Sequence, residues 1–233
     1  MIKKEFILQN PLRFIGDETE DILPEGGFGA VLARAGVGKT ALLVQLALHT
    51  LIKGKYVLHI SLDDPVNKIS LWYKEVFRNL TQSFEAKKKN KLWEDLLPYR
   101  FIMTFKVEGF SVPKLEERLT DLKEQNIFSP QVVLIDGFQF NDGVRTSLTE
   151  FKKLAQNHSV HVWFSVKTHR HETHDPEGMP PSLLDVSDLF DIVIQLRPEG
   201  KKIHVMTLKG GPPDSDRPAL FLDPATMLVK DTI

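Results

Sequence analysis

The stretch Ala33–Thr40 constrains this chain more than any other part of it. It reads Ala-Arg-Ala-Gly-Val-Gly-Lys-Thr, follows an apolar run from Phe28 to Leu32, and precedes another that begins at Ala41. A strand, a loop of small residues, Gly-Lys-Thr and then a helix is the layout of a phosphate-binding loop. Its glycines let backbone N–H groups converge on phosphate oxygens, and the helix directs its positive end to the same place.

Each residue of this loop has an expected role. Lys39 is expected to reach the β and γ phosphates, and the Thr40 hydroxyl to bind Mg²⁺. The first position is Ala33 in place of the usual glycine, which is acceptable where φ is negative. We therefore expect a nucleoside triphosphate such as ATP to contact Ala33, Arg34, Ala35, Gly36, Val37, Gly38, Lys39, Thr40 and Ala41. The alternative is a glycine-rich turn before a buried helix, which the strand–loop–helix context disfavours.

The composition bounds the remaining possibilities. A chain of 233 residues with 42% hydrophobic residues fits a single domain, residues 1–233, whose segment 1–25 lies against the core. The net charge of −1 gives no global basic field for nucleic acid. The absence of cysteine excludes disulfides, thiolate metal sites and thiol catalysis. No apolar stretch is long enough for a signal peptide or a bilayer span, so we expect a cytoplasmic protein with no membrane partner.

Strand-like and helix-like segments alternate along most of the chain. Strands are expected at 28–32, 56–62, 101–105, 131–137 and 160–166, and helices at 39–53, 66–98, 113–126 and 146–157. A hairpin at the sheet edge is expected from 190–196 and 203–208, and short strands at 6–8 and 219–222. The basic run 87–91 is expected to be a solvated helix face.

Acidic residues follow two of these strands. Asp136 ends four apolar residues, the layout of a Walker B strand whose aspartate holds Mg²⁺ through water. Asp63 and Asp64 end the strand at 56–62, and the carboxyl ends of parallel strands face the ligand crevice. Asp-Asp-Pro is also a good helix start, so one carboxylate can cap a helix while the other faces phosphate.

Four segments together resemble the RecA-like P-loop ATPases, most closely the branch containing KaiC and the DnaB-type helicases. They are Ala33–Thr40, His59–Pro65, Val132–Phe138 and Asp185–Leu196, and the likeness spans roughly residues 26–222. The resemblance implies an α/β fold: a mostly parallel twisted sheet flanked by helices, with a C-terminal antiparallel extension. It also implies Mg²⁺-dependent ATP hydrolysis and a homo-oligomer, either a filament or a ring such as a hexamer.

The same resemblance implies roles for three further residues. Asp63 stands where the family's catalytic glutamate stands, with Asp64 as its neighbour. The family's positive finger, supplied by the neighbouring subunit, falls in Thr207–Pro212, where Lys209 keeps a charge at the arginine position. A lysine lacks the planar fork of arginine, so stimulation in trans is expected to be weak. Arg217 is a further candidate, and the alternative for Lys209 is an ordinary exposed lysine at a hairpin end.

A histidine-rich loop at 167–178 occupies the place of the family's DNA-contacting loop. Lys167 and Arg170 suit that role together with His169 and His171, but Glu172, Asp175 and Glu177 offset their charge. Three of its histidines have metal-like spacing, yet Thr173 stands where an aspartate would precede the third one, so no metal is expected here.

The sequence thus favours a slow oligomeric ATPase that acts as a regulatory switch or a DNA-associated motor. Two alternatives remain open: an ATP-binding regulatory module with little or no turnover, and an accessory ATPase of DNA repair or replication. A small phosphate-loop kinase ranks last, because no arginine-rich lid is evident.

Overall fold

The computed structural model describes residues 12, 15, 22–106, 109–141, 143–168, 178–211 and 218–232. The expected strand at 6–8, the histidines of the loop that follows Thr168, and Arg217 lie outside these residues.

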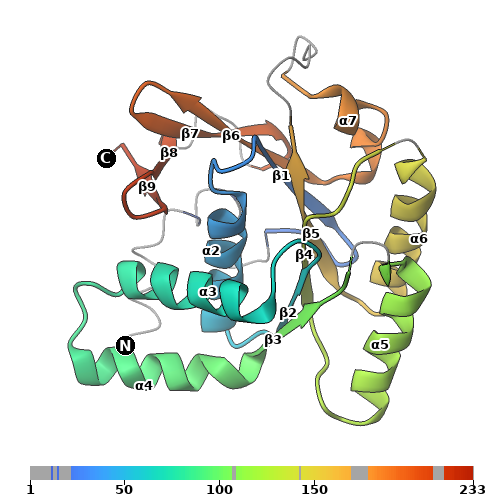
Figure 1. The fold of residues 1–233 in the computed structure, drawn as a ribbon, viewed down its shortest axis with the longest axis horizontal. Coiled ribbons are helices and arrows are strands. Elements are labelled where there is room, and N and C mark those ends of the chain that lie inside the picture. Colours follow the sequence, from blue (N-terminus) through green and yellow to red (C-terminus); the bar gives the residue numbers. More distant parts are fainter. Residues whose placement is uncertain are drawn as a thin grey trace.

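The described residues form one nine-stranded sheet in the order β3-β2-β4-β5-β1-β6-β7-β8-β9. The first six strands in this order pair in parallel, and the last three pair antiparallel (Figure 1). Their bounds are β1 (Phe28–Ala33), β2 (Val57–Ser61), β3 (Arg100–Thr104), β4 (Val132–Asp136), β5 (His161–Lys167), β6 (Ile192–Glu199), β7 (Lys202–Lys209), β8 (Leu220–Asp223) and β9 (Leu228–Asp231). The expected mostly parallel sheet with an antiparallel C-terminal extension is confirmed.

Helices cover both faces of the parallel strands (Figure 1). One hydrophobic cluster contains buried residues of α2 (Lys39–Ile52), α3 (Val66–Leu80) and α4 (Ala86–Leu96). The other contains buried residues of α5 (Val112–Glu124), α6 (Val144–Asn157) and the short α7 (Pro181–Leu184). Strands covered on both sides must be apolar throughout, which explains why they read as continuous hydrophobic runs.

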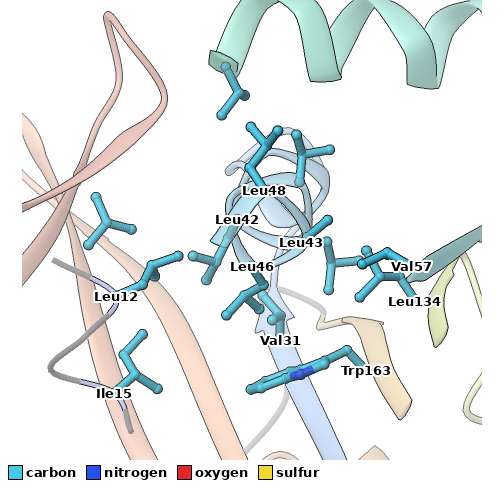
Figure 2. Packing of buried hydrophobic residues seen from close by; sticks show 14 of the residues in the cluster. Leu12, Ile15, Val31, Leu42, Leu43, Leu46, Leu48, Val57, Leu134 and Trp163 are labelled. Atoms are coloured by element: carbon cyan, nitrogen blue, oxygen red, sulfur yellow. The ribbon is translucent and has the colours of Figure 1, made fainter. Parts of the chain in front are cut away.

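Helix α2 is the centre of the first cluster and is buried along most of its length. In Figure 2, Leu46 points toward Val31 and Trp163 of the sheet, and Leu42 lies on the side of Leu12. Because close-packed interiors resist small displacements, this packing fixes the helix and therefore the loop that precedes it.

A buried amide ties the C-terminal strands to this helix. The Gln45 side chain donates from Nε2 to the Met227 carbonyl oxygen at 2.8 Å and accepts from the Val229 N–H at 2.9 Å. Leu222 of β8 lies so close to Gly38 that a Cβ on that glycine would be 2.6 Å from Leu222 Cδ2. The antiparallel strands β8 and β9 therefore pack against α2 and against Gly38 of the loop that precedes it.

Three details differ from the sequence-based expectations. The helical stretch expected at 66–98 is two helices, because α3 ends at Leu80, where the Thr81 N–H and hydroxyl both donate to the Phe77 carbonyl oxygen. Strand β9 was not expected, because a strand of only four residues with mixed polarity gives little sequence signal. As a result the hairpin β6–β7 is not at the sheet edge, which β9 occupies. The basic run 87–91 lies in α4 and is mostly exposed, as expected.

No helix among the described residues is long and apolar enough to cross a membrane.

A buried polar cluster lies between β2 and α3. His59 is fully buried and its Nδ1 lies 3.1 Å from the Tyr73 hydroxyl, while the Arg100 guanidinium stacks 4.6 Å from the centre of the Tyr73 ring. Burial lowers the pKa of His59 to about 4; the charge of Asp136 opposes this shift and that of Arg100 adds to it.

This histidine makes the free energy of unfolding depend on pH. Between about pH 6.5, the ordinary pKa, and about pH 4, the unfolded chain binds a proton at His59 that the folded chain does not. Stability should therefore fall as the pH falls through this window, by up to about 1.4 kcal/mol per pH unit. Urea unfolding at several pH values should show this slope in the wild type and a shallower one in His59→Gln. If stability depended equally steeply on pH in both proteins, His59 would not be the source of the pH dependence.

Candidate functional site

The carboxyl ends of β1, β2, β4 and β5 surround an open cleft of about 500 Å³. This is the edge at which ligands bind in open parallel sheets. Its lining includes Lys39, Thr40, Asp63, Asp64 and Asp136, all expected from the sequence, together with Ser165 and Lys167 of β5.

The loop between β1 and α2 has the backbone that a phosphate cradle needs. Ala33 ends β1 in extended conformation, so a non-glycine residue fits there. Gly36 (φ 75°) and Gly38 (φ 118°) adopt left-handed conformations that favour glycine. Gly38 is the N-cap of α2 and provides no side-chain cap, so the first N–H groups of the helix remain available to an anion.

Lys39 lies folded back over this loop. Its Nζ donates to the carbonyl oxygens of Ala33 at 2.9 Å and Arg34 at 3.1 Å. Burial lowers the pKa of Lys39, the charge of Asp136 opposes that shift and the charge of Lys167 adds to it. Because this ammonium has lost part of its hydration, hydrogen bonds to an anion would stabilise its charged form.

Two distant segments meet at the centre of the cleft. The Thr40 hydroxyl donates to Asp136 Oδ2 at 2.6 Å, although the two residues are 96 positions apart. Ser165 donates to the other carboxylate oxygen, Oδ1, at 2.5 Å and accepts from the Gly137 N–H at 2.9 Å. Asp136 is therefore oriented through both of its oxygens. Ser165 was not expected from the sequence, where its only signal is a hydroxyl inside an otherwise apolar strand.

The chemistry of these groups fits Mg²⁺. This ion takes oxygen ligands, uses one or two carboxylates, and completes its shell with water and substrate phosphates. Thr40 Oγ1 and the Asp136 carboxylate supply oxygen donors at one point, beside the phosphate-loop candidate. Among the described residues, no group of three or more His, Cys, Asp or Glu could hold a metal ion.

The two adjacent acids that follow β2 have different environments. The Asp63 carboxylate lies against the backbone of Gly137, where an added Cβ would be 2.7 Å from Asp63 Oδ2. Burial raises the pKa of Asp63, and the charges of Asp136 and Asp64 raise it further. Asp64 instead pairs with Lys68 at 2.8 Å, and its N–H donates to Ser61 Oγ at 2.9 Å. Asp63 is thus the acid that faces the junction of β2 and β4.

The alternative role of these acids, capping a helix, is not seen. The N-cap of α3 is Pro65, which makes no side-chain capping hydrogen bond, and the Asp64 carboxylate pairs with Lys68.

Lys209 lies away from the cleft of its own chain. It pairs with Val193 of β6, which is level with Ala30 of β1, so β7 ends toward the amino edge of the parallel strands. Its Nζ donates to the Ser187 carbonyl oxygen at 2.7 Å. The prediction for Lys209 concerned a neighbouring subunit's site, and it stays a prediction.

The packing of Asp63 on Gly137 can be tested by adding one methyl group. Gly137 has φ 92°, so alanine costs roughly 1–2 kcal/mol for the backbone and additionally displaces Asp63. Gly54→Ala is a matched control, since φ is 80° and nothing lies within 4 Å of the added Cβ. Denaturant unfolding should show a larger decrease in the free energy of unfolding for Gly137→Ala than for Gly54→Ala. Equal losses would mean that Asp63 does not rest on Gly137.

A comparison with protein families finds a match that covers more than half of the chain. The family model described as AAA domain matches residues 17–165, a range that includes the loop, Asp63, Asp136 and Ser165. A search of curated proteins found no match. The matched range covers more than half of the chain and ends before β6. With its glycine loop, the Thr40–Asp136 contact and a parallel sheet as the supporting geometry, the chain belongs to the AAA domain family, a family of P-loop NTPase type.

Proposed function

We propose that the protein binds ATP with Mg²⁺ in this cleft and hydrolyses it. The observation that carries the proposal is the meeting of Thr40 and Asp136 beside Lys39 and a helix N-terminus without a side-chain cap. In the proposed complex the loop N–H groups and the Lys39 ammonium bind phosphate oxygens, and Thr40 and Asp136 hold the ion. When bound, Mg²⁺ neutralises charge on the phosphates.

The proposed base is Asp63. Its carboxylate is positioned at Gly137, next to Asp136, where it can accept a proton from the attacking water. The water oxygen forms a bond to the γ phosphorus, the bond from that phosphorus to the bridging oxygen breaks, and ADP and phosphate leave. Asp63 carries the proton away in this scheme. A raised pKa makes the carboxylate a better proton acceptor near neutral pH.

Turnover is proposed to be slow. Aspartate is one methylene shorter than the glutamate of the RecA-like family, so its oxygen reaches less far into the cleft. The engagement of Lys209 with Ser187 of its own chain favours a second candidate, a module that binds ATP but turns over little. Both candidates share the binding site and differ only in rate.

The finer assignments from the RecA-like resemblance also remain proposals. These are membership of the KaiC and DnaB-type branch, assembly into a ring or filament such as a hexamer, and action as a regulatory switch or on DNA. Lys209 lies toward the amino edge of its own sheet, so a role for it at a phosphate would need the site of another copy, and the assembly proposal depends on that role. Light scattering with and without ATP tests this, and a strict monomer in both conditions would remove the assembly proposal.

The binding proposal predicts that Lys39→Ala abolishes measurable ATP binding. The variant removes the ammonium that lies over the loop, and charge-assisted hydrogen bonds to phosphate are about twice as strong as neutral ones. Lys74→Ala, an exposed lysine of α3, is the control and should bind as the wild type does. Calorimetric titration with ATP and Mg²⁺ measures both. Unchanged affinity in Lys39→Ala would overturn the proposed function.

The role of Asp63 predicts a separation of binding from turnover. Asp63→Asn should leave ATP affinity within about threefold and lower kcat by roughly 10²–10⁴-fold. Asp64→Asn removes the partner of Lys68 at the surface and should change kcat only slightly. Steady-state phosphate release distinguishes the two. If Asp64→Asn were the slower variant, the assignment of the base would be wrong.

A further inference from the structure

We propose that Leu222 is a positioning residue for phosphate binding, which holds Gly38 of the phosphate-loop candidate in the conformation that binds ATP. The inference rests on the proposed function and extends it to the C-terminal hairpin, residues 220–231, which consists of β8, β9 and the turn between them. Leu222 does not touch the nucleotide in this proposal. It acts through the backbone of the loop.

The two left-handed glycines of the loop have different surroundings. An added Cβ on Gly36 would meet no atom of the described residues within 4 Å. On Gly38 it would lie 2.6 Å from Leu222 Cδ2 and 3.5 Å from Met227 Sδ, and the first of these distances is too short for any real Cβ. Leu222 therefore occupies the space that a side chain at position 38 would need. The loop is open at Gly36 and packed at Gly38.

Gly38 is the residue at which the loop becomes a helix. It is the N-cap of α2, and its carbonyl oxygen accepts the Leu42 N–H at 3.0 Å. A rotation of its backbone would turn the neighbouring N–H groups away from a bound phosphate. Glycine by itself resists such a rotation poorly, because it populates more conformations than any other residue. A side chain packed against Gly38 therefore helps to keep these N–H groups convergent.

The C-terminal hairpin that carries Leu222 is fastened to two helices (Figure 1). Val229 is the register partner of Leu222 in β9, and its N–H donates to Gln45 Oε1 of α2 at 2.9 Å. Asn79 of α3 donates from Nδ2 to the Thr226 carbonyl oxygen in the turn at 2.9 Å. Moving the hairpin away from the loop would break these hydrogen bonds.

The turn of this hairpin is also fixed from within. The Asp223 carboxylate accepts two hydrogen bonds inside the turn and pairs with Lys230 at 2.5 Å. Met227 has φ 55°, a left-handed conformation that is uncommon for residues other than glycine. Its N–H donates to the Asp223 carbonyl oxygen at 2.7 Å, and its own carbonyl oxygen accepts from Gln45 at 2.8 Å. The hairpin is thus a firm support for the contact with the loop.

The test compares the two leucines of β8. Leu220 and Leu222 are both buried in the same hydrophobic cluster and leave the strand on the same face, but only Leu222 lies against Gly38. Leu222→Ala should weaken ATP binding about tenfold, the result expected if the loop keeps its binding conformation in about a tenth of the molecules. Leu220→Ala removes the same atoms from the cluster and should bind ATP as the wild type does.

Two further readouts separate positioning from a general loss of stability. Leu222→Ala should weaken ADP binding in the same proportion, because ADP uses the same loop, and should leave kcat at saturating ATP close to the wild-type value. Leu222→Met has a similar volume and should restore the affinity. A merely structural role would lower the folded fraction in both alanine variants and leave the dissociation constant of the folded molecules unchanged.

Calorimetric titration with ATP and Mg²⁺ measures the dissociation constant and the fraction of competent sites separately, and thermal unfolding measures stability. An unchanged dissociation constant in Leu222→Ala, or an equal rise in Leu220→Ala, would overturn the inference and leave the proposed function standing, since the wild type still binds. A wild type that bound no ATP would overturn both. If an alanine variant does not fold, valine at the same two positions makes the same comparison with a smaller cavity.

Discussion

The hydrogen bond between Thr40 and Asp136 is the contact on which the rest of the site depends. It joins the first turn of α2 to the end of β4, although strand β5 lies between β4 and the strand β1 that leads into α2. β5 takes part through Ser165, which holds the other carboxylate oxygen. β4, α2 and β5 thus fix the Asp136 carboxylate together. The candidate phosphate- and metal-binding residues lie around it.

The loop that faces this carboxylate is supported from two sides. Buried leucines of α2 fix the helix on the sheet, and Gln45 fastens β9 to the same helix, with Leu222 packed behind Gly38. The Lys39 ammonium donates hydrogen bonds to two carbonyl oxygens of the same loop. In the proposed complex, a phosphate would therefore enter a preformed loop, and the main adjustment would be the movement of the Lys39 side chain. Preorganisation of this kind reduces the entropy lost on binding.

The sequence predicted the parts of the site that lie in continuous motifs. The loop and Asp136 were recognisable because their residue types and spacing follow from what phosphate and Mg²⁺ require. The contact of Ser165 with Asp136 was not predictable, since it depends on β5 lying between β1 and β4, and local sequence pattern does not give the order of strands in a sheet. From the sequence, only the family resemblance distinguished Asp63 from Asp64; their different surroundings come from Gly137, Ser61 and Lys68. Strand β9 was missed because four residues of mixed polarity carry little signal.

The most direct test of the account is a crystal structure with a non-hydrolysable ATP analogue and Mn²⁺, located by its anomalous scattering. The account predicts a metal peak between Thr40 Oγ1, Asp136 and the phosphates, with Lys39 Nζ moved from the carbonyl oxygens of Ala33 and Arg34 to a phosphate oxygen. A triphosphate bound elsewhere, or a metal distant from Asp136 with Lys39 unmoved, would contradict it.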